Sequence, residues 1–151
     1  MTTETYLVPF DGSPLTTAAL DRAATYADAV DASVVALAVV PGDVTYARQK
    51  GWIAPGEPFD REAIADTLRS RVRERAPEAT FESVSVDGRF RRSTIAKRVR
   101  RTARSRGADV VFLGSANAGR LGTPSGSIGG RIATDSRYDV FIVRNAPSGG
   151  E

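Results

Sequence analysis

The chain of 151 residues has the length of one ordinary domain, with 41% hydrophobic residues, 26% charged residues and a net charge of +3. It contains no cysteine and no histidine, which excludes disulfides, thiolate and imidazole metal sites, cysteine nucleophiles and serine–histidine–aspartate triads. Because no apolar run approaches the roughly 20 residues that cross a bilayer, and residues 1–5 do not resemble a signal peptide, we expect a cytoplasmic protein without a membrane segment.

The first predicted elements are a strand and a helix. Residues 6–10 form a short apolar run that ends in Asp11-Gly12-Ser13-Pro14. Ser13 is a favourable N-cap and Pro14 fits the first position of a helix. Apolar residues then recur at steps of three and four up to Val30, which is typical of a helix packed on a sheet.

A second strand and a long connection follow. Residues 33–40 are almost continuously apolar, as in a parallel strand that is covered on both faces. Residues 41–58 contain several prolines and glycines and are predicted to form the longest irregular segment. We expect Trp52 and Ile53, which lie within it, to pack against the core or a partner rather than stack on a ligand.

The middle of the chain predicts another helix and strand. In residues 59–75, Ile64, Leu68 and Val72 recur at the spacing of a helix. Residues 81–86 alternate imperfectly between apolar and polar side chains, which favours a strand at the edge of the sheet.

The last third of the chain predicts two further helices and two buried strands. Ser93 is the expected N-cap of one helix and Gly107 its left-handed end. Residues 109–113 form an apolar strand, a second helix starts near Ser127, and residues 139–144 form the last strand. Residues 1–145 are expected to form a single domain, with residues 146–151 as a flexible tail.

This strict alternation of strands and helices predicts an α/β protein. Its fold is an open doubly wound sheet of five parallel strands, in the flavodoxin-like order 3-2-1-4-5, with helices on both faces. Ligands of such sheets bind at the carboxyl ends of the strands, where the strand order reverses. Asp11, Pro41, Asp87 and Gly114 all follow strands and are therefore expected at that edge.

The connection between residues 114 and 127 is the most informative segment. It is rich in glycine and hydroxyl side chains and leads from a buried strand into a helix. Backbone N–H groups in such a loop, together with the positive end of the helix dipole, favour phosphate. The segment therefore predicts an anion site, most plausibly for a nucleotide.

Several of these segments together resemble the universal stress protein family. The resemblance rests on residues 8–13, on residues 108–115, on Gly126-Ser127 and on the closing run 140–143. In members of the family that bind ATP, the loop reads glycine, two residues, glycine, nine residues, then glycine and a hydroxyl residue. Here Asn117 stands at the second glycine, and eight residues separate it from Gly126.

The resemblance implies a site for ATP or another adenine nucleotide, with Mg²⁺ near Asp11 as an accompanying ion. The implied nucleotide-binding residues are Pro9, Asp11, Val39, Gly114, Asn117, Gly126, Ser127 and Ile128. Arg89, Arg91 and Arg92 follow the third strand and are candidates to reach the phosphate tail. The alternative role of Asp11 is to cap the first helix, and that of the glycines is to form tight turns.

The resemblance further implies a stress-response protein that binds or senses a nucleotide, with at most slow ATP hydrolysis. A homodimer through strand 139–144 is expected, because an apolar edge strand is an aggregation risk when it stays unpaired. The alternatives are a dimeric protein-interaction module that binds no nucleotide and, ranked below it, a binder of nucleic acid or another anionic surface through the basic helix 93–106. An adenylyl transferase and a phosphoacceptor receiver domain fit less well, since the first needs histidine and the second an acidic pair after the first strand.

Overall fold

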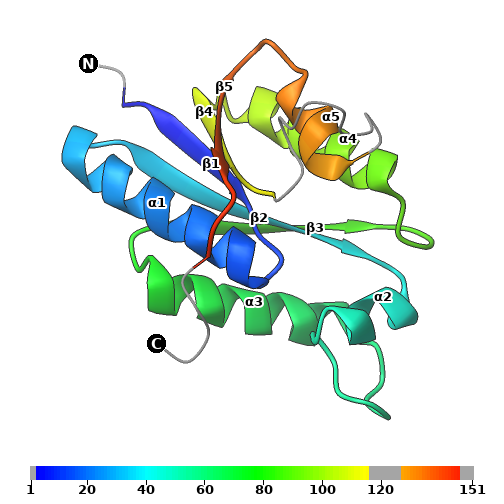
Figure 1. The fold of residues 1–151 in the computed structure, drawn as a ribbon. Helices are drawn as coiled ribbons and strands as arrows, with labels where there is room; N and C mark the ends of the chain where they lie inside the picture. Colours follow the sequence, from blue (N-terminus) through cyan, green and yellow to red (C-terminus); the bar gives the residue numbers. More distant parts are fainter. Residues whose placement is uncertain (1–2, 116–126, 147–151) are drawn as a thin grey trace.

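The computed structural model describes residues 3–115 and 127–146, and its centre is a five-stranded parallel sheet (Figure 1). The strand order β3-β2-β1-β4-β5 confirms the predicted topology. In chain order the elements are β1 (Thr5–Pro9), α1 (Pro14–Val30), β2 (Ser33–Pro41), α2 (Val44–Gln49), α3 (Arg61–Arg75), β3 (Thr80–Val86), α4 (Arg92–Ser105), β4 (Val110–Gly114), α5 (Ile128–Ala133) and β5 (Asp139–Val143).

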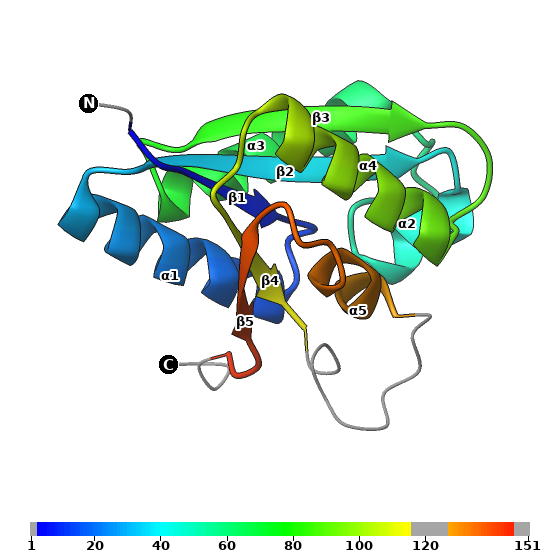
Figure 2. The same ribbon diagram turned by 90° about the horizontal axis from the view of Figure 1, so that it is seen from above.

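The sheet separates two hydrophobic layers. Neighbouring residues of β1 point to opposite faces, so Val8 belongs to one layer and Leu7 to the other. The Val8 layer is covered by α1 and α3, whereas the Leu7 layer is covered by α4 and α5, which contact each other (Figure 2). The strand order reverses between the neighbouring strands β1 and β4. The helices that follow these two strands, α1 and α5, therefore lie on opposite faces of the sheet.

The start of α1 follows the prediction. Ser13 is its N-cap and accepts a hydrogen bond from the Thr16 N–H at 3.4 Å, and Pro14 is the first helical residue. The last residue of the helix is Val30, and its C-cap Asp31 takes the left-handed conformation with φ of 61°. A short polar residue at this position replaces the more usual glycine.

The prediction of an irregular segment over residues 41–58 was wrong in part. It contains the six-residue helix α2, whose N-cap Asp43 accepts a hydrogen bond from the Tyr46 N–H at 3.0 Å. A helix this short has too few turns to show an apolar period. The remaining residues hold no further helix or strand until Asp60, which caps α3, so that helix starts at Arg61 rather than at residue 59.

The predicted cap of α4 was also wrong. The N-cap is Arg91, which makes no capping hydrogen bond with its side chain, and Ser93 lies inside the first turn. The helix therefore starts at Arg92, one residue before the predicted cap Ser93. Gly107 follows the helix with φ of 62°, which confirms the predicted left-handed end.

The two edges of the sheet are β3 and β5, which confirms β3 as an edge strand. In the described parts of the chain, no helix is long and apolar enough to cross a membrane.

Candidate functional site

The candidate site lies where the carboxyl ends of β1, β2 and β4 meet. Pro9 ends β1 and pairs with Leu37, so Val39 lies two residues beyond the last paired position of β1. Gly114 ends β4 on the other side of β1. The structure therefore places the described candidates at one edge, whereas Asn117 and Gly126 lie outside the described residues.

Asp11 follows β1 and uses both carboxylate oxygens. Its Oδ1 accepts hydrogen bonds from the Ser13 N–H at 2.9 Å and from the Thr16 hydroxyl at 2.8 Å. Its Oδ2 lies 2.6 Å from Nζ of Lys50. Asp11 thus supports the turn into α1 but does not cap the helix as the alternative expected, because the N-cap is Ser13.

The Asp11–Lys50 ion pair changes the ionisation of both groups. Burial by itself would raise the pKa of Asp11, but the hydrogen bonds from Lys50 and Ser13 lower that pKa below its ordinary value. Burial would likewise lower the pKa of Lys50, but the neighbouring Asp11 carboxylate raises it. The pair therefore stays ionised across the neutral range.

Residues 43–53 are held over the Asp11 turn by more than this ion pair. The indole Nε1–H of Trp52 donates to the carbonyl oxygen of Asp11 at 2.8 Å, and Nζ of Lys50 lies 5.5 Å from the centre of the Tyr46 ring. Trp52 and Ile53 are buried among core residues, which confirms that they pack rather than stack on a ligand.

Mg²⁺ that accompanies a nucleotide is held by the phosphates and one or two carboxylates, and at this turn the carboxylate would be that of Asp11. One of the carboxylate oxygens already binds an ammonium group at 2.6 Å. In the part of the chain that the structure describes, no three acidic side chains gather closely enough to hold a metal ion. The expected Mg²⁺ near Asp11 therefore receives no support from the residues present there.

Gly114 is required by packing. A Cβ atom at this position would lie 2.3 Å from the carbonyl oxygen of Leu15 and 2.7 Å from the Thr16 nitrogen. No real Cβ tolerates such distances from backbone atoms, so only glycine fits. This close approach brings the end of β4 against the first turn of α1, directly after Asp11.

Ser127 and Ile128 begin α5 on the other face of the sheet. The helix starts beside Ser127, as predicted, and Ser127 is its N-cap, with its hydroxyl accepting a hydrogen bond from the Gly130 N–H at 3.0 Å. Ile128 is half-buried and packs against the layer that α4 and α5 cover.

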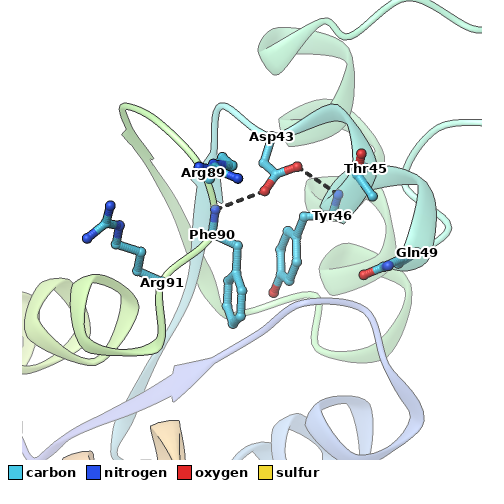
Figure 3. A pocket seen from close by; sticks show the side chains of 7 residues that line it. All are labelled: Asp43, Thr45, Tyr46, Gln49, Arg89, Phe90 and Arg91. Carbon is cyan, nitrogen blue, oxygen red and sulfur yellow. Dashed lines mark hydrogen bonds between the residues drawn. The ribbon is translucent and has the colours of Figure 1, made fainter.

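The three candidate arginines follow β3, and β2 and β1 lie between β3 and the strand that ends at Gly114. β3 lies three steps of about 4.8 Å from β4 and extends beyond the end of β1, so these arginines start more than about 14 Å from the end of β4. Arg89 and Arg91 line a pocket together with residues of α2. In Figure 3 the Arg91 side chain points away from Asp43 and from α2, and both Arg91 and Arg92 are exposed.

A pocket of about 260 Å³ lies between α2 and the connection from β3 to α4 (Figure 3). The Asp43 carboxylate joins its two sides, because it accepts hydrogen bonds from the N–H groups of Tyr46 and Phe90 at 3.0 and 2.9 Å. The rings of Tyr46 and Phe90 stack with centroids 4.3 Å apart. The pocket is lined by Asp43, Thr45, Tyr46, Gln49, Arg89, Phe90 and Arg91.

Sequence reasoning missed Asp43, Tyr46 and Lys50 as residues of this edge. For Asp43 a signal existed, because an aspartate directly after Pro41-Gly42 is a favourable N-cap. For Lys50 no local signal existed, since its partner Asp11 is 39 residues away in sequence.

Comparisons with known proteins agree with this architecture. The model of the universal stress protein family matches residues 3–144. A search among curated proteins found no match. Among solved structures, a universal stress protein in complex with cAMP superposes with a TM-score of 0.60 at 20% identity and covers 95% of this chain and 98% of that chain.

Two further solved structures show the same fold. The universal stress protein UspA from Lactobacillus plantarum gives a TM-score of 0.59 at 18% identity, with 95% of this chain and 99% of that chain covered. The universal stress protein from Archaeoglobus fulgidus in complex with dAMP gives 0.52 at 14%, with 94% and 98% covered. Since the family model spans nearly the whole chain and the sheet order agrees, the chain belongs to the universal stress protein family.

Proposed function

We propose that this protein binds an adenine nucleotide, such as ATP or AMP, at the carboxyl ends of β1 and β4. It acts in the stress response by binding or sensing this ligand rather than by catalysis. Two solved members of the family were obtained with cAMP and with dAMP, both adenine nucleotides. The absence of histidine and cysteine from the chain is consistent with a binding role.

One observation carries the proposal, namely that the end of β4 lies directly beside the Asp11 turn. It fixes the start of the glycine-rich connection beside the Asp11 turn, at the point where the strand order reverses. Pro9, Asp11 and Val39 would line the adenine and ribose. Gly114, Ser127 and Ile128, with Asn117 and Gly126, would surround the ribose and phosphates.

Lys50 adds a charge that the sequence did not predict at this edge. Its side chain is 31% exposed while it pairs with Asp11. An ammonium group has three N–H donors, so Lys50 can donate to a ligand oxygen while it stays paired with Asp11. We therefore include Lys50 among the residues that would contact the nucleotide.

The proposed test measures nucleotide affinity by isothermal titration calorimetry. ATP, ADP, AMP, cAMP and dAMP are titrated into the wild-type protein, and at least one is expected to bind below millimolar concentration. Asp11→Asn should weaken that binding by about 10- to 150-fold, because a hydrogen bond to a charged group contributes about 1.5–3 kcal/mol. Mass spectrometry of small molecules released from denatured protein provides an independent readout.

Asp87→Asn is the matched control, since it makes the same charge change at the end of β3, where Asp87 is fully exposed. It should leave nucleotide affinity unchanged. A wild-type protein that ignores all five nucleotides at millimolar concentration would overturn the proposal and favour the protein-interaction module. Equal weakening of nucleotide affinity by Asp87→Asn would show that the effect of Asp11→Asn comes from the net charge alone.

We also propose a cytoplasmic homodimer that pairs through β5. The motivation is the apolar character of this edge strand, which otherwise offers unpaired backbone groups to other chains.

A further inference from the structure

The positive charge of this protein is concentrated in one segment. Residues 88–108 contain nine arginine or lysine side chains and no aspartate or glutamate. Because the whole chain has a net charge of only +3, the remaining residues together carry −6. The molecule is therefore strongly bipolar although its net charge is modest.

The fold turns part of this segment into a continuous surface. Ala96, Val99 and Ala103 bury one side of α4 against the sheet. Lys97, Arg101 and Arg104 recur at steps of four and three on the opposite side and are exposed. We call these three residues the α4 basic face, and Arg91 and Arg92 at the start of the helix are exposed as well.

The charges of the α4 basic face are not neutralised by ion pairs within the described structure. Nearby acids are used by other arginines: Arg100 pairs with Asp135 at 3.3 Å, and Arg106 pairs with Glu82 at 2.8 Å. Among residues 3–115 and 127–146, no carboxylate lies within 4.0 Å of the three cations of the face, or of Arg91 and Arg92. Like charges held this close repel one another, so the surface fits an anionic partner.

The chemistry of the face selects among anionic partners. Its apolar side is buried, so it has nothing to insert into lipid. Residues 91–106 contain no aromatic side chain on which single-stranded bases could stack. What remains is a row of cations, mostly guanidinium groups, along a 14-residue helix about 21 Å long, which suits repeated phosphates.

We propose that the α4 basic face binds the phosphate backbone of double-stranded nucleic acid without reading its sequence. Such binding needs no base-reading motif. The face lies on α4, away from the Asp11 turn, so this function is independent of the proposed nucleotide site.

The test uses fluorescence anisotropy with a short labelled DNA duplex and the RNA duplex of the same sequence, each in a series of salt concentrations. Wild-type affinity should fall steeply between about 50 and about 200 mM salt. The double variant Arg101→Gln/Arg104→Gln should lower the slope of log K against log salt by about 1.8, which corresponds to two lost phosphate contacts. Arg101→Lys/Arg104→Lys should keep most of the binding, because it keeps the charges.

The double variant Arg22→Gln/Arg73→Gln is the matched control. It removes the same charge from exposed positions of α1 and α3, on the opposite face of the sheet, and should keep the wild-type slope. Three results would overturn the proposal: no binding of either duplex at low salt, equal losses in both glutamine variants, or binding of phosphatidylserine vesicles that the duplex does not displace. Thermal unfolding by circular dichroism checks that each variant is folded.

Discussion

At the scale of single residues, Asp11 shows how one side chain joins the fold to the site. It supports the turn into α1 through Ser13 and Thr16, and it also holds Lys50 from a distant segment. These contacts are compatible with a ligand at the same edge, because the Asp11 side chain is still 25% exposed. Asp11 can therefore support the turn into α1 and contact a ligand at the same time.

The Asp11–Lys50 pair predicts a dependence of stability on pH. Because the pKa of Asp11 is lowered in the folded state, its contribution is present above its ordinary pKa and is lost as pH falls through the folded value. Because the pKa of Lys50 is raised, its contribution is present below its ordinary pKa and is lost as pH rises through the folded value. Between these limits the pair should stabilise the fold.

Lys50→Met tests this pair. Burial then acts on Asp11 without its ammonium partner, so the pKa of Asp11 should rise and acid unfolding should begin at a higher pH. The measurement is a pH titration of the Asp11 carboxyl carbon by NMR, together with unfolding in urea at several pH values. Arg48→Met, an exposed position on α2, should leave the Asp11 titration unchanged. An unchanged Asp11 titration in Lys50→Met would contradict the role of the pair.

At the scale of elements, α2 depends on contacts beyond its own length. A six-residue helix is marginal by itself, and Asp43 both caps it and accepts the Phe90 N–H of the next connection. The stacking of Tyr46 on Phe90 and the edge contact of Tyr46 with Trp52 also stabilise the position of α2. We therefore expect α2 to open as a unit with the residues over Asp11.

Asp43→Ala should loosen this unit and lower stability by about 1 kcal/mol, as typical for a lost N-cap. Trp52 is the single tryptophan, so its emission should shift to longer wavelength as its burial decreases. Asp60→Ala removes the cap of α3 at a similar cost, yet it should leave the emission wavelength unchanged. Identical spectra for the two variants would show that Asp43 does not hold α2 in place.

Most of the sheet could be predicted from the sequence, because its strands are buried apolar runs and its long helices have clear periods. Ser13 was identified as a cap because a hydroxyl residue in front of a helix has a direct local function. The start of α4 was missed because Arg91 caps the helix with backbone alone. Lys50 was missed because its contact with Asp11 arises only when the sheet forms.

At the scale of the whole molecule, the two edges of the sheet differ in character. On β3 the side chains of Thr80, Ser83 and Ser85 are polar and exposed, which discourages pairing with another chain. On β5 the residues after Asp139 are all apolar, and Ile142 is half-buried without belonging to either core layer. This asymmetry selects β5 as the edge for the proposed homodimer.

Ile142→Lys should therefore convert a dimer into a monomer with little loss of fold stability. Sedimentation equilibrium measures the mass in solution, and circular dichroism checks the secondary structure. Val30→Lys, at an apolar position that is 59% exposed on α1, should remain dimeric. A monomeric wild-type protein, or a dimer that survives in Ile142→Lys, would argue against pairing through β5.

The contact between Gly114 and the Leu15 carbonyl has a consequence for the comparison of homologues. Since neighbouring backbone alone excludes a side chain at position 114, related chains with this geometry should retain glycine there whether or not they take up a nucleotide. Invariance at that position across a family would consequently report on architecture. Divergence of ligand preference should instead be traced through the counterparts of Asp11, Val39 and Lys50.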